Sequence, residues 1–109
     1  MARILLLLGP NSRHAATIAA VLERHRHTPQ IAAYVEDGLR QLARGDSRYD
    51  VVIVDMSRNA PSEWNILDQV LKIVAADSPK PMVLCLSDIY RGPAMQLEVE
   101  RKGARLLWI

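Results

Sequence analysis

The sequence predicts a single doubly wound α/β domain over residues 1–109, built on a five-stranded parallel sheet in the order 2-1-3-4-5. Three observations carry this prediction. Five short apolar runs recur along the chain, amphipathic segments separate them, and the connections are short. Continuous apolar runs are typical of parallel strands buried on both faces, with helices forming right-handed crossovers between them. Five strands connected in this way commonly take that order.

The predicted strands and helices alternate without exception. The strands are expected over residues 3–8, 30–36, 49–55, 82–87 and 104–109, and the helices over 11–27, 37–46, 63–77 and 91–103. The first run, RILLLL, ends at Gly9-Pro10. Asn11 or Ser12 can cap the helix that follows. Its apolar stripe, which predicts the face turned to the core, consists of Ala15, Ile18, Ala19 and Leu22.

The remaining elements follow from the same signals. QIAAYVE, introduced by Pro29, predicts the second strand, and Gly45 can end the short second helix. YDVVIVD predicts the third strand. The third helix carries a stripe made of Leu67, Val70, Leu71 and Val74. MVLCLS and ARLLWI predict the last two strands, and a weakly patterned helix between them stops at Gly103.

The composition argues against a nucleic-acid-binding, secreted or membrane-spanning protein. The net charge is +2 from 14 basic and 12 acidic residues, and the basic residues are dispersed, which disfavours a nucleic-acid surface. The apolar run at residues 4–8 is too short for a signal peptide or a membrane span. Cys85 is the one cysteine and lies inside an apolar run, which indicates a buried thiol. We therefore expect a cytoplasmic protein that binds neither nucleic acid nor membrane.

The predicted strand order defines where a site would lie. The order reverses between strands 1 and 3, and the crevice outside the carboxyl ends of the strands is the usual binding place in such sheets. The residues that converge there are Gly9, Pro10, Asn11 and Ser12 after the first strand, Asp55 at the end of the third, and Ser87 and Asp88 at the end of the fourth. Asp55 is open to two interpretations: a reactive carboxylate, or one that binds main-chain N–H groups of its own loop.

The whole chain resembles a receiver domain of bacterial two-component response regulators, which have a flavodoxin-like fold. The residues that carry the resemblance are YDVVIVDMS, KPMVLCLSD and ERKGARLLWI. The resemblance implies that Asp55 matches the aspartate that accepts a phosphoryl group from a histidine kinase. It also implies that Ser87 matches the hydroxyl residue that contacts that group, and that Leu107 matches the aromatic switch position.

The chain departs from the receiver pattern at several positions. Gly9 and Pro10 occupy the positions of the two acids that bind Mg²⁺ in that family, and Pro61 lies six residues after Asp55 rather than four. The family's lysine beyond the fifth strand has no counterpart before Ile109. Because a transferring phosphoryl group needs a metal ion and cations to neutralise its charge, we expect a degenerate site without a metal or cofactor.

These departures leave three functional hypotheses. The first is a receiver-like signalling module, not an enzyme, which binds a protein partner such as a histidine kinase or an output protein and works without conventional phosphorylation. The second is a true phosphoacceptor domain phosphorylated on Asp55. The third is a small flavodoxin-like enzyme or cofactor-binding protein, although the crevice residues offer no base–nucleophile pair.

The resemblance also implies a fifth helix beside the first, on one face of the sheet. The sequence contains no residues for it after Ile109. Large side chains at the end of the fifth strand would then lack cover, which predicts a homodimer or another complex that buries them. The candidate interface residues are Leu106, Leu107, Trp108 and Ile109.

Overall fold

The computed structural model describes seven stretches of the chain: residues 2–7, 14–32, 34–44, 48–57, 60–77, 80–87 and 92–108. They form five strands, which are β1 (Arg3–Leu7), β2 (Thr28–Ile31), β3 (Val51–Asp55), β4 (Met82–Ser87) and β5 (Arg105–Trp108). Four helices alternate with them, which are α1 (Ala15–Arg24), α2 (Val35–Arg44), α3 (Pro61–Val74) and α4 (Pro93–Arg101). Among the described residues no helix follows β5.

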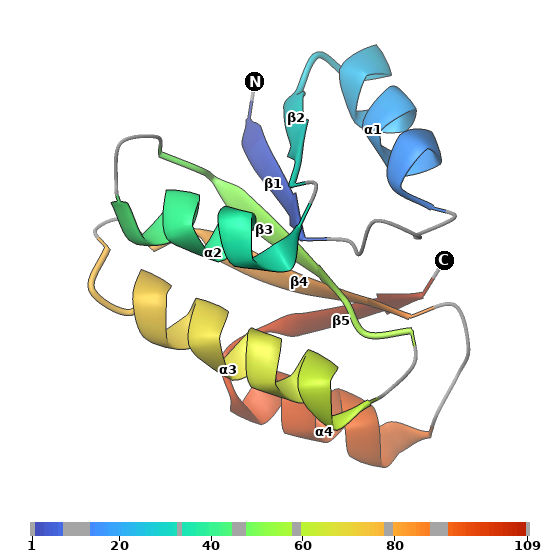
Figure 1. Cartoon of the computed structure of the whole chain (residues 1–109). Helices are drawn as coiled ribbons and strands as arrows, with labels where there is room; N and C mark the ends of the chain where they lie inside the picture. The colour runs from blue at the N-terminus through green and yellow to red at the C-terminus, as the bar shows by residue number, and fades with distance from the viewer. Residues whose placement is uncertain are drawn as a thin grey trace.

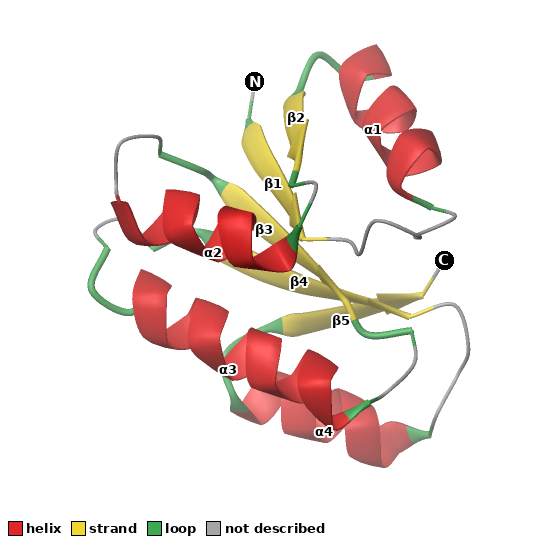
Figure 2. Cartoon of the chain, viewed as in Figure 1, coloured by secondary structure: helices red, strands yellow, loops and turns green. Residues whose placement is uncertain are grey.

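All five strands are parallel and lie in the order β2-β1-β3-β4-β5, which confirms the predicted sheet. Helices α2, α3 and α4 lie together on one side of the sheet, and α1 lies alone on the other (Figure 1). Each helix joins two strands, so the layers follow directly from the alternation of apolar and amphipathic segments (Figure 2). None of the helices in the described stretches is long and apolar enough to cross a membrane.

The second strand differs most from the prediction. It spans Thr28–Ile31 rather than 30–36, and the helix after it starts at Val35 rather than at residue 37. Pro29 lies inside the strand, opposite Ile4. Proline is tolerated there because β2 is an edge strand with a single neighbour. The apolar residues Tyr34 and Val35 therefore belong to the turn and the start of α2.

Other helix boundaries shift as well: α1 ends at Arg24 rather than at residue 27, and α3 ends at Val74 rather than at residue 77. Helix α3 begins at Pro61, two residues before the predicted start, because proline lacks only an N–H that a first helical residue leaves unpaired anyway. The Glu63 carboxylate accepts a hydrogen bond from the main-chain nitrogen of Ala60 at 3.2 Å, which helps to fix this start. Helix α4 begins at Pro93 after Gly92, whose φ of 89° favours glycine.

The core is unequal on the two sides of the sheet. The larger cluster lies under α2, α3 and α4, and its buried residues include Leu5, Leu7, Val52, Val54, Leu67, Val70, Cys85, Val99 and Leu106. The smaller cluster lies under α1 and contains four buried residues, Ile4, Leu6, Ile53 and Leu86. The predicted stripe of α1 packs against this smaller cluster but stays half-buried. The face under α2, α3 and α4 therefore holds most of the core, and the face under α1 holds less.

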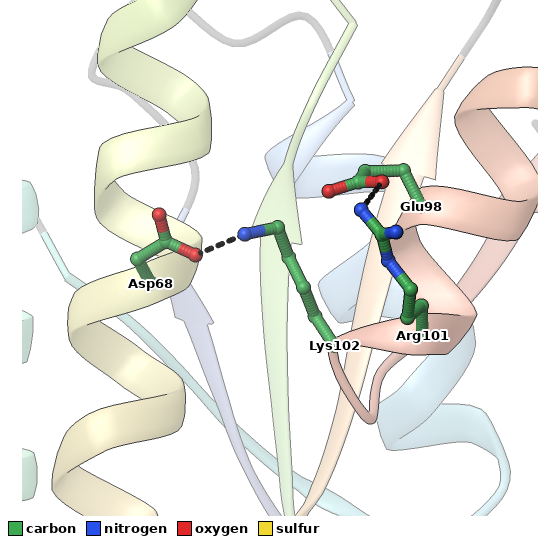
Figure 3. A network of polar contacts seen from close by, with 4 residues as sticks. All are labelled: Asp68, Glu98, Arg101 and Lys102. Atoms are coloured by element: carbon green, nitrogen blue, oxygen red, sulfur yellow. Dashed lines mark hydrogen bonds and ion pairs between the residues drawn. The ribbon is translucent and has the colours of Figure 1, made fainter.

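Polar contacts also join the elements to one another. The Tyr49 hydroxyl lies 2.9 Å from Oε1 of Gln30 and 3.2 Å from Oε1 of Gln41, which ties β2, α2 and the segment before β3. The guanidinium of Arg3 lies over the Tyr49 ring. Lys102 Nζ lies 2.9 Å from Oδ1 of Asp68, joining the end of α4 to α3 (Figure 3).

Candidate functional site

Asp55 and Ser87 end two neighbouring strands. Asp55 is paired with Leu86, and the main-chain nitrogen of Met56 donates to the carbonyl oxygen of Leu86 at 2.8 Å, so the pairing continues past the end of β3. Ser87 in turn is paired with Trp108 of β5. The predicted aspartate and hydroxyl therefore lie at the same carboxyl edge of the sheet, where the strand order places the crevice.

The carboxylate of Asp55 is half-buried and already has a partner in its own loop. Its Oδ1 accepts a hydrogen bond from the main-chain nitrogen of Ser57 at 2.9 Å. A short polar side chain that binds the N–H two residues on is the geometry of an Asx turn. Met56 between them is fully buried and anchors the turn in the main core. This is the loop-binding interpretation of Asp55 that the sequence left open.

Ser87 and Asp55 lie on opposite faces of their strands. Strand alternation puts Asp55 on the face of Val51 and Ile53, which turns toward α1. Ser87 is fully buried and shares the face of Val83 and Cys85, under the other helices. A ligand that contacts both side chains would therefore have to bind at the end of the strands, across the edge of the sheet.

The remaining crevice residues lie outside the described part of the chain. They are Gly9, Pro10, Asn11, Ser12 and Asp88. Within the described stretches, no three histidine, cysteine, aspartate or glutamate side chains come together as a metal-binding group. The described carboxylate at this edge is Asp55, and hard Mg²⁺ prefers several carboxylate or carbonyl oxygens around it.

Cys85 is buried in the main core as the sequence predicted. Burial raises the pKa of its thiol to about 12, because the thiolate loses its solvation there. The thiol therefore stays neutral at physiological pH. A neutral thiol is a poor nucleophile and a poor metal ligand, which leaves Cys85 a packing role.

The four candidate interface residues do not share one environment. Leu106 is 8% exposed and packs in the main core, so it is not part of an uncovered surface, and its inclusion among the interface candidates was wrong. Leu107 is 44% exposed on the opposite face of the same strand. Ile109 and the side chain of Trp108 lie outside the described part. The sequence argument failed for Leu106 because it treated the end of the strand as one surface, whereas alternate residues face opposite ways.

Three residues that the sequence argument missed share a face of the sheet with Leu107. Met82 and Leu84 on β4 and Arg105 on β5 are on the face of the sheet that carries α1. Met82 and Arg105 are exposed, and Leu84 is half-buried. The sequence could have predicted this grouping, because alternate residues of the neighbouring strands MVLCLS and ARLLWI lie on the same face of the sheet.

Comparison with solved structures identifies proteins with a similar fold. Neither a protein-family model nor a curated protein matches this sequence. Among solved structures, the chain is similar to the Vibrio cholerae chemotaxis protein CheY4, with a TM-score of 0.74 and 20% identity over 100% of this chain and 85% of that one. A response regulator from Thermotoga maritima gives a TM-score of 0.75 and 16% identity over 99% of this chain and 83% of that one.

A receiver domain from Clostridium thermocellum agrees with these two. Its TM-score is 0.74 at 24% identity, over 99% of this chain and 81% of that chain. The shared sheet order and the full coverage of this chain show that it has a receiver-like, flavodoxin-like fold. Identities at this level establish the fold, and the function has to be argued from the residues of the site.

Proposed function

We propose that this chain is a receiver-like signalling module that acts by binding other proteins and is not phosphorylated on Asp55 by the Mg²⁺-dependent route. The observation that carries the proposal is the identity of Gly9 and Pro10, which stand where the resemblance places two metal-binding acids. Glycine and proline offer main-chain carbonyl oxygens but no carboxylate. Mg²⁺ would then meet fewer carboxylate oxygens than a receiver site normally provides, and the phosphoryl group would lack the metal ion that neutralises its charge.

The environment of Asp55 supports the same proposal. Its carboxylate holds the N–H of Ser57, so its contribution to the turn is sufficient to explain an aspartate at the end of β3. Ser87 is fully buried rather than presented to a ligand at the surface. A residue that stabilises its loop needs no phosphoryl chemistry to account for its presence.

The proposed activity is non-enzymatic. By residue type, the crevice positions of the sequence offer no base–nucleophile pair. Cys85 is held neutral in the core. The proposed partner is a protein of a bacterial cytoplasmic signalling pathway, such as a histidine kinase or an output protein, rather than nucleic acid or membrane. Self-association, which the sequence analysis expects, remains a prediction.

A second candidate is a phosphoacceptor domain that uses Asp55. The observation that favours it is the placement of Asp55 and Ser87 at the ends of adjacent strands β3 and β4 in a receiver-like fold. In this candidate, acids from the crevice segments would have to be assembled differently from the usual pair.

Intact mass separates the two candidates. The full chain is incubated with acetyl phosphate and Mg²⁺ and compared with Asp55→Asn treated in the same way. We expect no gain of a phosphoryl group in either protein. A phosphate-sized gain in the wild-type chain that disappears in Asp55→Asn would establish the second candidate. A gain that persists in Asp55→Asn would indicate modification elsewhere and would leave the proposal standing.

A further inference from the structure

A histidine ring fastens the turn between α1 and β2 to the start of β1. Nδ1 of His27 accepts a hydrogen bond from the main-chain nitrogen of Ala2 at 3.1 Å. The carbonyl oxygen of the same Ala2 accepts a hydrogen bond from the nitrogen of Thr28 at 2.9 Å. Figure 1 shows this turn beside the beginning of β1. His27 therefore extends the pairing of β1 with β2 by one side-chain bond, ahead of the first paired residues, Arg3 and Thr28.

The end of α1 holds His27 in position. The nitrogen of His27 donates to the carbonyl oxygen of Leu22 at 2.9 Å, and the nitrogen of Arg26 donates to that of Glu23 at 3.0 Å. Arg26 between them has a φ of 66°, in the left-handed region. These two bonds around a left-handed residue are the Schellman motif, which ends a helix. The half-buried ring of His27 thus joins the last turn of α1 to β1.

The bond between Ala2 and His27 requires a neutral imidazole. A main-chain N–H can only donate, so Nδ1 of His27 has to accept with its lone pair, and the ring proton has to lie on Nε2. When an imidazole takes up a second proton, both of its nitrogens become donors. Two N–H groups would then face each other at this position. Protonation of His27 and the bond to Ala2 therefore exclude one another.

The opposite side of β1 is held by a different group. Oδ2 of Asp50, which precedes β3, accepts a hydrogen bond from the nitrogen of Arg3 at 2.8 Å, and the nitrogen of Asp50 donates to the carbonyl oxygen of Arg3 at 2.8 Å. Carboxylates generally stay ionised over the range in which histidine changes charge. Mild acid therefore acts on the β2 side of β1 and leaves the β3 side fastened.

The charged groups around the turn act in both directions on a protonated ring. The last turn of α1 carries Glu23 and Arg24, the turn itself carries His25 and Arg26, and β1 carries Arg3. The basic residues disfavour another positive charge, whereas Glu23 and the partial negative charge at the end of α1 favour one. These influences affect the pH at which the ring takes up its proton. The loss of the acceptor follows from protonation at whatever pH it occurs.

We infer that His27 is a pH-dependent latch, which fastens the α1–β2 turn to the start of β1 while its ring is neutral and releases it when the ring is protonated. The released part is the end of α1 together with the first residues of β2. The latch responds to proton concentration alone, and it requires neither a partner protein nor chemistry at Asp55. It therefore goes beyond the proposed function and does not depend on it.

The test is an NMR titration of the full chain from about pH 7.5 to about pH 5.5, within the range in which histidine changes charge. Intact mass first confirms that Met1 is retained, so that Ala2 has an amide. At the upper pH we expect a scalar coupling across the hydrogen bond between the amide nitrogen of Ala2 and Nδ1 of His27. The coupling should disappear as the ring is protonated. The protection of the Thr28 amide against exchange should fall roughly two- to tenfold, the equivalent of one hydrogen bond.

His27→Asn is the decisive variant. Its side-chain oxygen is bonded to Cγ, as Nδ1 is, so it can accept the same bond, and it does not titrate. The protection of Thr28 should then stay constant across the pH range. His27→Ala should lower this protection at both ends of the range, because the acceptor is gone. His25→Asn is the matched control, because it removes an exposed histidine of the same turn and should keep the response of the wild-type chain.

Three results would overturn the inference. The first is a coupling that is absent at the upper pH or that survives protonation of His27, and it needs no variant. The second is a His27→Asn chain whose Thr28 protection falls with pH as in the wild type. The third is a response that disappears in His25→Asn, which would assign it to the other histidine of the turn.

Discussion

Oδ1 of Asp55 accepts a hydrogen bond from the main-chain nitrogen of Ser57 across 2.9 Å, and this bond closes the turn that leaves β3. Removing the acceptor should leave a partly buried N–H without its partner. We expect Asp55→Ala to lower the free energy of unfolding by about 1–3 kcal/mol. Asp55→Asn keeps a side-chain oxygen at the same place and should lose less than half as much. Urea unfolding of the three proteins gives the comparison, and equal losses in both variants would argue against the turn role.

Gly38 is required by close packing in α2. A Cβ at this position would lie 3.0 Å from the Cβ of Ala32 and well inside van der Waals contact with Cδ2 of Leu7. Leu7 is almost fully buried and has little room to move. Although alanine favours helices, we expect Gly38→Ala to be destabilising by about 1–3 kcal/mol. The control is Ala43→Ser on the exposed side of the same helix, expected within about 0.5 kcal/mol of wild type.

The Tyr49 hydroxyl links β2 to α2 through Gln30 and Gln41. It has one proton to share between two acceptors, so its loss should count as one hydrogen bond. Tyr49→Phe keeps the ring and its contact with Arg3 and should lower stability by about 0.5–1.5 kcal/mol in chemical denaturation. Tyr34→Phe removes the hydroxyl of an exposed tyrosine and should change nothing measurable. Equal effects of the two substitutions would contradict the link.

Cys85 should make stability fall at alkaline pH. Its pKa is about 12 in the folded chain against 9.0 for the ordinary thiol, so above pH 9 the unfolded chain loses a proton that the folded chain keeps. The contribution is fully present below pH 9 and is lost as pH rises toward 12. We expect the stability difference between wild type and Cys85→Ala to shrink over this range in thermal melts. A constant difference from pH 8 to 11 would exclude the effect.

Most of the fold could be predicted from local sequence patterns because the strand sequences are continuous apolar runs. RILLLL, VVIVD and MVLCLS are long apolar runs with clear ends, and helices between them leave little choice but a parallel sheet. The second strand was misplaced because Pro29 looks like a boundary. Its acceptance inside β2 depends on that strand being at an edge, which local sequence does not reveal.

The candidate site was predictable in part. Asp55 and Ser87 could be placed together from topology alone, because parallel strands end at one edge. The sequence left two roles open for Asp55, and only the structure shows the hydrogen bond that its carboxylate accepts from the nitrogen of Ser57. The exposure of Met82 and Arg105 depends on how much of its face of the sheet α1 covers. This is a property of the tertiary structure and cannot be predicted from a short segment of sequence.

The unequal division of the core has a consequence for local unfolding. None of the ten residues of α1 is buried, and the cluster beneath it holds four buried residues. Regions with few buried apolar contacts open at a lower free energy than the global transition. Amide hydrogens of α1 should therefore exchange with solvent faster than those of α3, whose Leu67, Val70 and Val74 are buried. Hydrogen exchange under native conditions would then resolve the molecule into an early-opening unit around α1 and a late-opening unit formed by β3, β4 and α3.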